Sequence, residues 1–389
     1  MILAHKIQIG PTRKQARYFA QACGTSRFVW NWALEEWNRQ YKSGEKPNGM
    51  KLKKQFNEIK YEQFPWLSDI HRDAHARPFT NLQTAFVSFF KKRSKRPKFK
   101  KKGVHDSFYV ANDKLNLDGN RIRLPVIGWV RLRETLRFNG KIMGATVSRM
   151  TDRWFASIQV DIGDYQKERS SDGVVGVDLG LKSTVTLSTG EVFNSPKALK
   201  QHLKRLRRLS RQHSRKQKGS ENRKKLSNRL AKLHWQIKCQ RHDWLHKLTS
   251  RLVSRTKILI VEDLSVKNMM ANHKLARSIS DEGWYEFRRQ LDYKSQIYGT
   301  EVVVAPRFYP SSKTCSNCGH VKATLSLGER AYICSECGFS LDRDLNAARN
   351  LYTLSLREIY ACGHCVSPAS TEAVVVETGT RPCTLVYTN

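Results

Sequence analysis

The sequence has no apolar run of 18 residues, about the minimum length of a membrane-spanning helix. Its first residues, Met1-Ile-Leu-Ala-His-Lys, also lack the apolar segment of a secretory signal. Acidic residues are scarce: 34 Asp and Glu stand against 70 Lys and Arg in 389 residues, a formal net charge of +36. We therefore expect a cytoplasmic protein with no membrane partner. Its 39% hydrophobic content is enough for a buried core, which excludes a disordered basic protein.

The positive charge is concentrated in two blocks. Residues 91–102 hold nine basic residues and no acidic one, and residues 197–247 hold 18 basic and two acidic residues. Solvated helix faces are the ordinary interpretation of such runs. In a block of only positive charges, however, the side chains repel one another, and an anionic partner is needed to neutralise them. In a chain this basic they indicate a polyanionic partner: nucleic acid is the partner we expect, and an anionic membrane surface is the alternative.

The first 162 residues place a helical segment between β segments. Residues 3–9 alternate like a strand, and apolar residues then recur at helical spacing to about residue 90. One predicted apolar face is made of Trp30, Ala33, Leu34, Trp37 and Tyr41, and another of Leu82, Phe86, Phe89 and Phe90. Residues 106–162 change to short alternating runs with Gly and Asn-Gly turns. We expect a helical bundle and a small antiparallel β-barrel, with the strand at 3–9 pairing into the barrel.

The rest of the chain predicts an α/β fold. Apolar strands at 173–180, 257–262 and 301–305 alternate with a basic helical hairpin at 197–247 and a helix at 284–298. In such folds, ligand sites lie at the carboxyl ends of the central strands. Acidic residues at those ends are therefore candidate ligands.

Four cysteines have the spacing of a zinc site. Cys315, Cys318, Cys334 and Cys337 form Cys-x2-Cys-x15-Cys-x2-Cys, and a glycine follows each pair. Two such turns place four thiolates tetrahedrally around one Zn²⁺. A redox-active pair is the alternative, but it does not explain two pairs. With four protein ligands the predicted site is closed and structural.

A further pair, Cys362 and Cys365, has no partner pair. His364 could join it in a second metal site, which stays an open alternative. The tail at 361–389 is rich in Ser and Thr, and we expect it to be disordered.

Three acidic residues lie at the ends of predicted buried elements. Asp178 ends VVGVD, Glu262 ends ILIVE, and Asp344 lies in LDRDLNAARN where a helix begins. One such acid would be explained by a helix cap or a salt bridge. Three such acids in a strongly basic chain instead suggest that they bind two Mg²⁺ ions, which would promote the attack of water on a phosphodiester. This combination is typical of a nuclease of the RNase H/RuvC fold.

Two neighbouring acids compete with these assignments. Asp263 follows Glu262 but points to the opposite face if the strand continues. Asp342 precedes Asp344 by two residues, and we favour Asp344 because it is nearer the helix start and Asn346.

Six motifs carry a family resemblance. They are VDLGLKS at 177–183, VEDLSVKNM at 261–269, SISDEGWYEFRRQLDYK at 278–294, PSSKTCSNCG at 310–319, CSECG at 334–338 and LDRDLNAARN at 341–350. In these motifs the sequence resembles the TnpB (OrfB) family, which bacterial and archaeal insertion sequences encode and which is related to type V CRISPR effectors. The resemblance is colinear from residue 1 to about 360.

The resemblance implies a multidomain α/β and β architecture. An RNase H-like RuvC nuclease domain at 171–308 and 340–360 would be interrupted by a zinc ribbon at 309–339 that binds target nucleic acid. A wedge-type β-barrel domain at 1–10 and 104–170 would hold an inserted helical recognition domain at 11–103.

The resemblance also implies an RNA-guided, Mg²⁺-dependent endonuclease that cleaves double-stranded DNA beside a short transposon-adjacent motif. Its guide RNA would come from the transposon end. Asp178, Glu262 and Asp344 would be the catalytic Mg²⁺ ligands, and the four cysteines the zinc ligands. Arg72 and its neighbours on the helix after PWLSDI are candidates for reading the motif. We expect a monomer, associated with the nucleoid of a bacterium or archaeon.

Three other functions are alternatives to this one. A non-cleaving RNA-guided DNA-binding protein is disfavoured by the intact set of acids. A transposase that joins strands itself also uses three acids on this fold, so the acids do not exclude it. A zinc-ribbon RNA-binding protein would leave the three strand-end acids unexplained.

Overall fold

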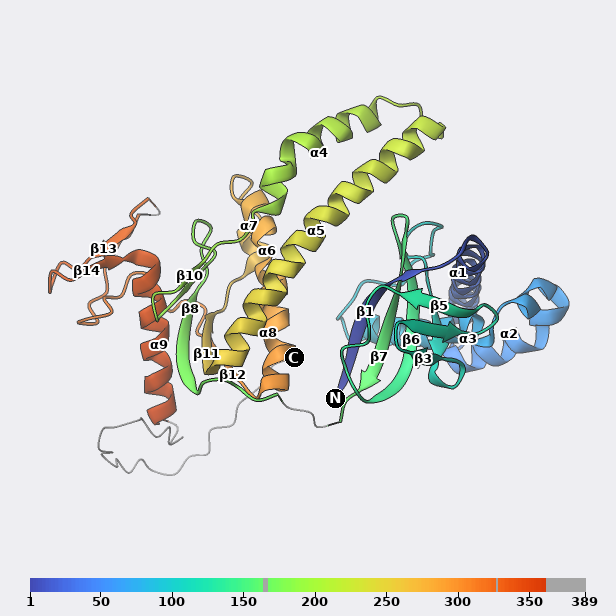
Figure 1. The fold of residues 1–389 in the computed structure, drawn as a ribbon, viewed down its shortest axis with the longest axis horizontal. Coiled ribbons are helices and arrows are strands. Elements are labelled where there is room, and N and C mark those ends of the chain that lie inside the picture. Colours follow the sequence, from blue (N-terminus) through green and yellow to red (C-terminus); the bar gives the residue numbers. More distant parts are fainter. Residues whose placement is uncertain (164–166, 327, 362–389) are drawn as a thin grey trace. The chain divides into compact units, whose positions relative to one another are not determined.

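The computed structural model describes residues 1–163, 167–326 and 328–361 (Figure 1). The chain forms two compact units, Met1–Tyr165 and Gln166–Asn389. Within the described residues, no helix is long and apolar enough to cross a membrane. The predicted tail disorder and the proposed second metal site at Cys362, His364 and Cys365 lie outside the described residues.

The first unit contains the predicted helices. They are α1 (Arg13–Lys42), α2 (Gly49–Gln63) and α3 (Arg72–Phe90), with 3-10 turns η1 (Pro65–Asp69) and η2 (Asn112–Lys114). A capping box starts α1, because Gln15 N donates to Thr12 Oγ1 and Thr12 N donates to Gln15 Oε1. The rings of Trp37 and Phe86 stack with centroids 4.1 Å apart and fix α1 against α3.

Two aromatic residues predicted to be in this core are not buried. Tyr41 and Phe90 are each 60% exposed. Both lie in the last turn of their helix. The prediction was wrong at these positions. The apolar spacing continues to the last turn of each helix, but in the described residues the core does not extend to these two side chains.

The strands of the first unit form one antiparallel sheet. They are β1 (Ile2–Gly10), β2 (Ser107–Ala111), β3 (Asn116–Asp118), β4 (Arg121–Leu124), β5 (Gly128–Leu132), β6 (Lys141–Met150) and β7 (Arg153–Asp161). The order is β2-β6-β7-β1-β5-β4-β3. As predicted, the first strand joins this sheet: β1 pairs with β7 from Ile2 to Ile9. The three helices therefore lie in the chain between two strands of one sheet.

The predicted barrel is wrong. In the described residues no ladder joins the two ends of the sheet, β2 and β3. The free edge of β2 is occupied by side chains from the start of α3: Ala111 N donates to Asp73 Oδ2 over 2.8 Å, and His71 Nε2 lies 3.0 Å from Tyr109 O. Because these side chains satisfy the edge, and β3 is only three residues long, the sheet stays open.

The second unit is built on a mixed five-stranded sheet in the order β10-β9-β8-β11-β12. Its strands are β8 (Gly173–Asp178), β9 (Val185–Leu187), β10 (Val192–Phe193), β11 (Thr256–Glu262) and β12 (Glu301–Ala305). The central strands β8, β11 and β12 are parallel, and β9 and β10 are antiparallel. A separate hairpin pairs β13 (Ala331–Ile333) with β14 (Ser340–Asp342).

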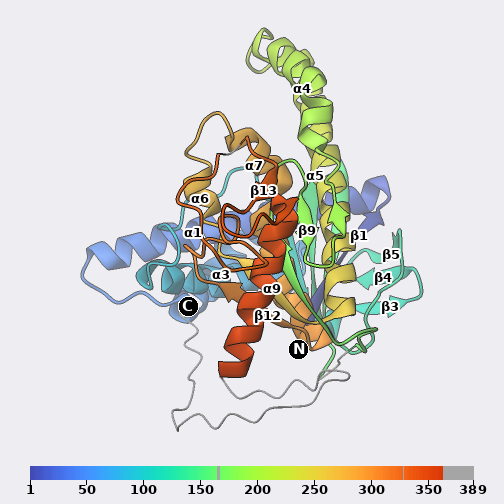
Figure 2. The same cartoon turned by 90° about the vertical axis from the view of Figure 1, so that its left-hand side faces the viewer.

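Helices cover both faces of this sheet. The helices of this unit are α4 (Ala198–Ser214), α5 (Glu221–Arg255), α6 (Val266–Met269), α7 (Ala276–Glu282), α8 (Trp284–Tyr298) and α9 (Arg343–Ala361). Of these, α5 and α8 pack on one face of the sheet and α9 packs on the other. On β11, Leu259 and Val261 pack in the core that α5 and α8 complete, whereas Ile258 and Ile260 pack with Leu351 of α9. Figure 2 shows α9 lying along the sheet. A Cβ at Gly176 of β8 would collide with the Ala348 carbonyl, so α9 packs directly on the strand.

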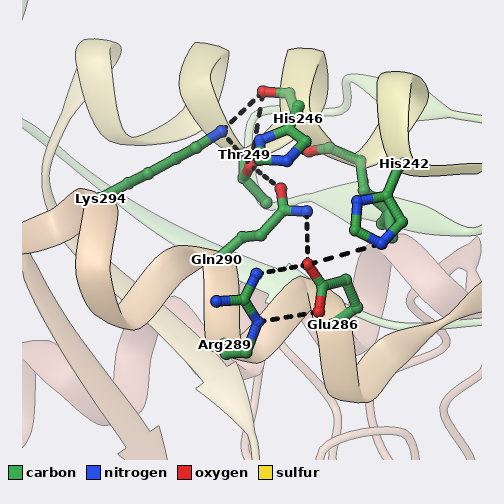
Figure 3. A network of polar contacts seen from close by, with 8 residues as sticks. His242, His246, Thr249, Glu286, Arg289, Gln290 and Lys294 are labelled. Atoms are coloured by element: carbon green, nitrogen blue, oxygen red, sulfur yellow. Dashed lines mark hydrogen bonds and ion pairs between the residues drawn. The ribbon is translucent and has the colours of Figure 1, made fainter. Parts of the chain in front are cut away.

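A buried polar network joins α5 to α8 (Figure 3). Lys294 Nζ donates to His246 O, Thr249 Oγ1 and Ser250 Oγ, each over 2.8 Å. Burial lowers the pKa of Lys294 to about 8. The fully buried Gln290 accepts from Thr249 Oγ1 and donates to Glu286 Oε1. Because donors on each helix meet acceptors on the other, this network fixes the C-terminal half of α5 against α8.

Candidate nuclease and zinc sites

Sheet register brings Asp178 and Glu262 together. The parallel ladder pairs Val177 of β8 with Val261 of β11, so the next residues, Asp178 and Glu262, end adjacent strands. Side chains alternate along a strand. Asp178 therefore shares its face with Gly176, and Glu262 shares its face with Ile258 and Ile260. Both carboxyl groups lie on the side of the sheet that α9 covers.

The first turn of α9 adds Asp344 on this side. A Cβ built on Gly180, just after β8, would lie 3.7 Å from Asp344 Oδ2. Asp342 has a different role: its Oδ1 accepts from Asp344 N over 3.0 Å and from Leu345 N over 3.1 Å. It is therefore the N-cap of α9. The side chain of Asp342 is exposed, whereas that of Asp344 is half-buried toward β8.

The environment of these carboxyl groups disfavours their ionised forms. Burial, followed by the nearby Glu262 and Asp344 charges, raises the pKa of Asp178 well above its usual value. Burial also raises the pKa of Glu262 and of Asp344, and the charge of Asp342 adds to the rise at Asp344. Among the described residues, no hydrogen bond or ion pair of the Asp178 carboxyl is found. Three such groups need either protons or a bound cation.

Asp263 is occupied elsewhere. Its Oδ2 lies 2.6 Å from Arg307 Nη2 and accepts a hydrogen bond from Arg307 Nε over 2.8 Å. The strand β11 ends at Glu262, so this ion pair, and not strand alternation, holds Asp263. The two adjacent acids thus have different roles. Glu262 belongs to the acid cluster, and Asp263 is the ion-pair partner of Arg307.

A serine that the sequence analysis did not single out orients Glu262. Ser311 Oγ donates to Glu262 Oε1 over 2.7 Å. The Ser311 segment is held by α9, because Asn350 Nδ2 donates to Ser311 O and Thr314 O, each over 2.7 Å. Asn346 Nδ2 also donates to Thr314 O, over 2.7 Å. The motifs PSSKTC and NAARN contain these residues, but their spacing alone does not reveal the contacts.

Basic residues surround the acid cluster. Lys182, after β8, and Arg330, before β13, are exposed, and both lie near enough to Asp344 to favour its ionised form. Arg343 has the same effect, and its Nη1 donates to Ser326 O over 2.9 Å. A negatively charged ligand is therefore attracted to the rim of a site whose centre is anionic.

The four predicted cysteines come together. Their sulfur atoms all lie within 4.8 Å of one another, and no other cluster of three or more His, Cys, Asp or Glu ligand atoms meets this distance in the described ranges. The Sγ atoms of Cys315 and Cys337 are 3.8 Å apart, and those of Cys318 and Cys334 are 3.6 Å apart. Four sulfurs about 2.3 Å from one tetrahedral ion lie about 3.8 Å from each other. The arrangement fits Zn²⁺ and is too open for disulfides.

Each cysteine pair is held by the same turn. Gly319 N donates to Cys315 O, and Gly338 N donates to Cys334 O. Both glycines have positive φ, +80° and +67°, which side chains disfavour. Tyr332 is fully buried between the two turns, and its hydroxyl donates to Lys313 O. Modules with so small a core commonly depend on a bound metal for stability.

The larger basic block forms the α4–α5 hairpin, which extends from the sheet as a long arm (Figure 1). Leu209, Leu233 and Ile237 fill the seam between the two helices. Asp281 caps α4, accepting from Leu199 N and Lys200 N. Exposed basic residues cover the arm: Lys204, Arg205, Arg207, Arg208, Arg211, Arg215, Lys216, Lys218, Lys224, Lys225, Arg229 and Lys232.

The first unit holds Arg72, a predicted candidate for reading DNA. Its guanidinium lies 3.3 Å from Asp73 Oδ1 and 3.7 Å from Asp113 Oδ2, so it is already paired. Farther along α3, Arg77 and Asn81 line a polar cavity of about 240 Å³. The Arg77 guanidinium lies over the Tyr109 ring, 4.5 Å from its centroid.

Three family profiles match the chain. OrfB_IS605, described as a probable transposase, matches residues 157–273, and the Cas12f1-like TNB domain matches residues 284–351. The helix-turn-helix domain of OrfB_IS605 matches residues 1–46, which here form β1 and the single continuous helix α1.

Proteins of known name match nearly the whole chain. A Streptomyces pristinaespiralis protein named RNA-guided DNA endonuclease is 38% identical over 376 residues, 94% of this chain and 92% of that protein. Escherichia coli K12 InsQ, with the same description, is 34% identical over 93% of this chain and 94% of its own length. Among solved structures, the cryo-EM structure of a Cas12f1–sgRNA–target DNA complex matches with a TM-score of 0.54 and 16% identity, covering 88% of this chain and 83% of that one. This last likeness shows a shared fold.

Proposed function

Because this chain belongs to the TnpB (OrfB) family, we propose that it is a transposon-encoded, RNA-guided endonuclease that cleaves double-stranded DNA beside a short transposon-adjacent motif. One observation carries the proposal. Carboxyl groups from β8, β11 and α9 gather at one edge of a sheet in a chain whose net charge is +36. The basic surface would bind a polyanion, and the carboxyl cluster would bind the divalent cations that promote its hydrolysis.

In this proposal, the second unit is an RNase H-like RuvC nuclease domain, at 171–308 and 340–360, interrupted by a zinc ribbon at 309–339. The first unit is a wedge-type β domain with an inserted helical recognition domain at 11–103. The parallel strands β8, β11 and β12 and the helix α9 support the nuclease assignment, and the four clustered sulfurs support the ribbon.

Asp178, Glu262 and Asp344 would hold Mg²⁺, in a two-ion site as such nucleases use. The donors fit, since Mg²⁺ prefers carboxylate oxygen, and a cation would offset the burial and the charge repulsion that together raise the pKa of Asp178. When bound, Mg²⁺ supplies activation of water and stabilisation of the leaving oxygen. Cys315, Cys318, Cys334 and Cys337 would hold one Zn²⁺.

The protein's own residues then position the reaction. Ser311 fixes the orientation of the Glu262 carboxylate, and Asn350 fixes Ser311. Lys182 and Arg330 would attract the phosphates of the strand to be cut.

Specificity would come mainly from guide RNA, derived from the transposon end and paired with target DNA. The exposed basic arm of α4 and α5 suits the backbone of such a duplex, because its charge is spread along two helices. Arg77 and Asn81 are residues of the kind that read guanine and adenine edges, so we add them to Arg72 as the candidates for reading the adjacent motif. Such a nuclease would act in the bacterial cytoplasm, at the nucleoid.

The test is to purify the protein with co-expressed RNA from its transposon end, sequence the bound RNA and identify its guide segment. A new guide segment should redirect Mg²⁺-dependent cleavage to a matching DNA that retains the flanking motif. Protein stripped of RNA should not cut at a defined site.

The same assay decides the alternatives. RNA-free protein that cuts or joins one defined DNA sequence would show a strand-transferring transposase. A complex that binds its target but never cuts it would show a non-cleaving DNA-binding protein.

A further inference from the structure

Phe308 is the most exposed large apolar side chain in the described part of the chain. Its relative exposure is 92%, against 60% for Phe90 and 54% for Phe99. It lies in residues 306–310, which link β12 to the cysteine module. Single exposed apolar residues are common and need no explanation by themselves. Phe308 differs from them because its loop lies beside the carboxylate cluster.

Both ends of this loop lie at Glu262. The last residue of β12, Ala305, pairs with Glu262 in the parallel ladder. Ser311, just after the loop, donates its hydroxyl hydrogen bond to Glu262 Oε1. Phe308 is therefore at the tip of a short loop that leaves the carboxylate cluster and returns to it.

The loop is held rigidly. Tyr309 N donates to Pro306 O over 2.9 Å, which closes a turn with Phe308 at a central position. On one side Arg307 is paired with Asp263, and on the other the Tyr309 hydroxyl donates to Asn350 O over 3.3 Å. Because its two neighbours are anchored, the Phe308 side chain is held outward into solvent.

The surroundings identify a ligand that is both anionic and aromatic. The exposed cations Lys182 and Arg330 lie around the same cluster and suit phosphates. A nucleobase offers the flat apolar surface that an exposed ring requires, and stacking of this kind accepts any base.

We propose that Phe308 stacks on an unpaired nucleobase of the strand that enters the carboxylate cluster and so positions its backbone. This inference rests on the proposed nuclease function. A base within a duplex already has both faces covered, so the ring requires a locally unpaired strand. Phe308 acts through binding geometry and takes no part in proton transfer.

The first test measures single-turnover cleavage by the guide-loaded protein. Phe308→Ala should slow cleavage by about tenfold, the low end of the effect of a lost base–aromatic stack. Phe308→Trp should restore the rate to near that of the unmodified protein. Phe90→Ala, the same change at an exposed phenylalanine of the other unit, should leave the rate unchanged. Thermal unfolding should be the same for Phe308→Ala and the unmodified protein.

A second test locates the base. Target DNA with single abasic sites is scanned through the cleaved region. The unmodified complex should be slowed at one main position, and Phe308→Ala should show no further loss there. Effects that add at every position would overturn the proposal, because they would show that ring and base do not interact.

A third test does not require cleavage. Single-stranded DNA carrying 2-aminopurine is bound at saturation, and stacking on Phe308 should quench its fluorescence more in the unmodified protein than in Phe308→Ala. Equal fluorescence, equal cleavage rates, or a loss of rate explained by unfolding would each overturn the role of Phe308. A guide-loaded protein that never cuts but shows the quenching would overturn the proposed function alone.

Discussion

The cysteine module and the carboxylate cluster assemble anionic groups in two different ways. The four cysteines lie between residues 315 and 337, in two similar turns with a small core around Tyr332. The three acids are 84 and 82 residues apart in the chain and are brought together by the register of β8 with β11 and by α9. A local module of this kind needs its ion in order to fold, whereas the sheet that carries the acids has a hydrophobic core of its own. Loss of one cysteine should therefore unfold the cysteine module, whereas loss of one acid should inactivate the carboxylate cluster and leave the sheet folded.

The largest expected effect is the loss of zinc. Cys334→Ser should reduce bound zinc from about one ion per chain to none, because a closed site needs four ligands. Structural zinc contributes about 10 kcal/mol or more to folding in small metal-binding modules, so the ribbon should unfold. Elemental analysis and proteolysis between residues 309 and 339 measure this. Cys239→Ser, at a cysteine of α5 outside the cluster, is the control. A ratio near two zinc ions per chain would instead implicate Cys362 and Cys365.

Removing a carboxylate should inactivate without unfolding. Asp178→Ala is expected to slow single-turnover cleavage by about a thousandfold or more, since metal-ion stabilisation contributes several kcal/mol. Guide and target binding should change little, because no basic side chain is altered. Cleavage rates and filter-binding affinities measure the two effects. Normal cleavage by this variant would remove the acid cluster from the mechanism.

A matched pair separates Asp344 from Asp342. Asp344→Asn should abolish cleavage, whereas Asp342→Asn should retain it, because asparagine also caps helices. Asp342→Ala should cost about 1 kcal/mol of unfolding free energy through loss of the cap. Cleavage assays and denaturant titrations measure these changes. The opposite pattern, with Asp342 required and Asp344 dispensable, would exchange their assigned roles.

The smallest effect concerns pH and the metal-free protein. The pKa of Asp178 is raised in the folded state, so the unfolded carboxyl ionises at lower pH than the folded one. Above the usual aspartate pKa of about 3.9, the unfolded state therefore binds fewer protons, and stability from this group falls with rising pH. In Mg²⁺-free buffer with zinc present, Asp178→Asn should be about 1 kcal/mol more stable than the unmodified protein at neutral pH, and the difference should shrink toward pH 4.

Added Mg²⁺ supplies the control for that measurement. It should stabilise the unmodified protein at neutral pH and have less effect on the Asp178→Asn variant, because ligand binding to the folded state raises its stability. A variant that is less stable than the unmodified protein at every pH would contradict the raised pKa assigned to Asp178.

Features that depend on local spacing could be predicted from the amino-acid sequence. Two Cys-x2-Cys pairs with following glycines predicted the four-sulfur cluster, since each turn is contained within a few residues. Apolar strands ending in Asp178 and Glu262 predicted a sheet with acids at one edge. The alternating pattern at 3–9 predicted the strand that joins the β domain.

Which neighbouring groups share a site became clear from the folded chain alone. It assigned Asp342 to the cap of α9 and Asp263 to an ion pair, and it brought Ser311 to Glu262 through contacts with Asn350. It also left the first sheet open, because His71 and Asp73 occupy the edge of β2. These outcomes depend on contacts between residues far apart in the chain, and neither periodicity nor spacing reports which distant side chain will satisfy a given backbone edge or carboxyl group.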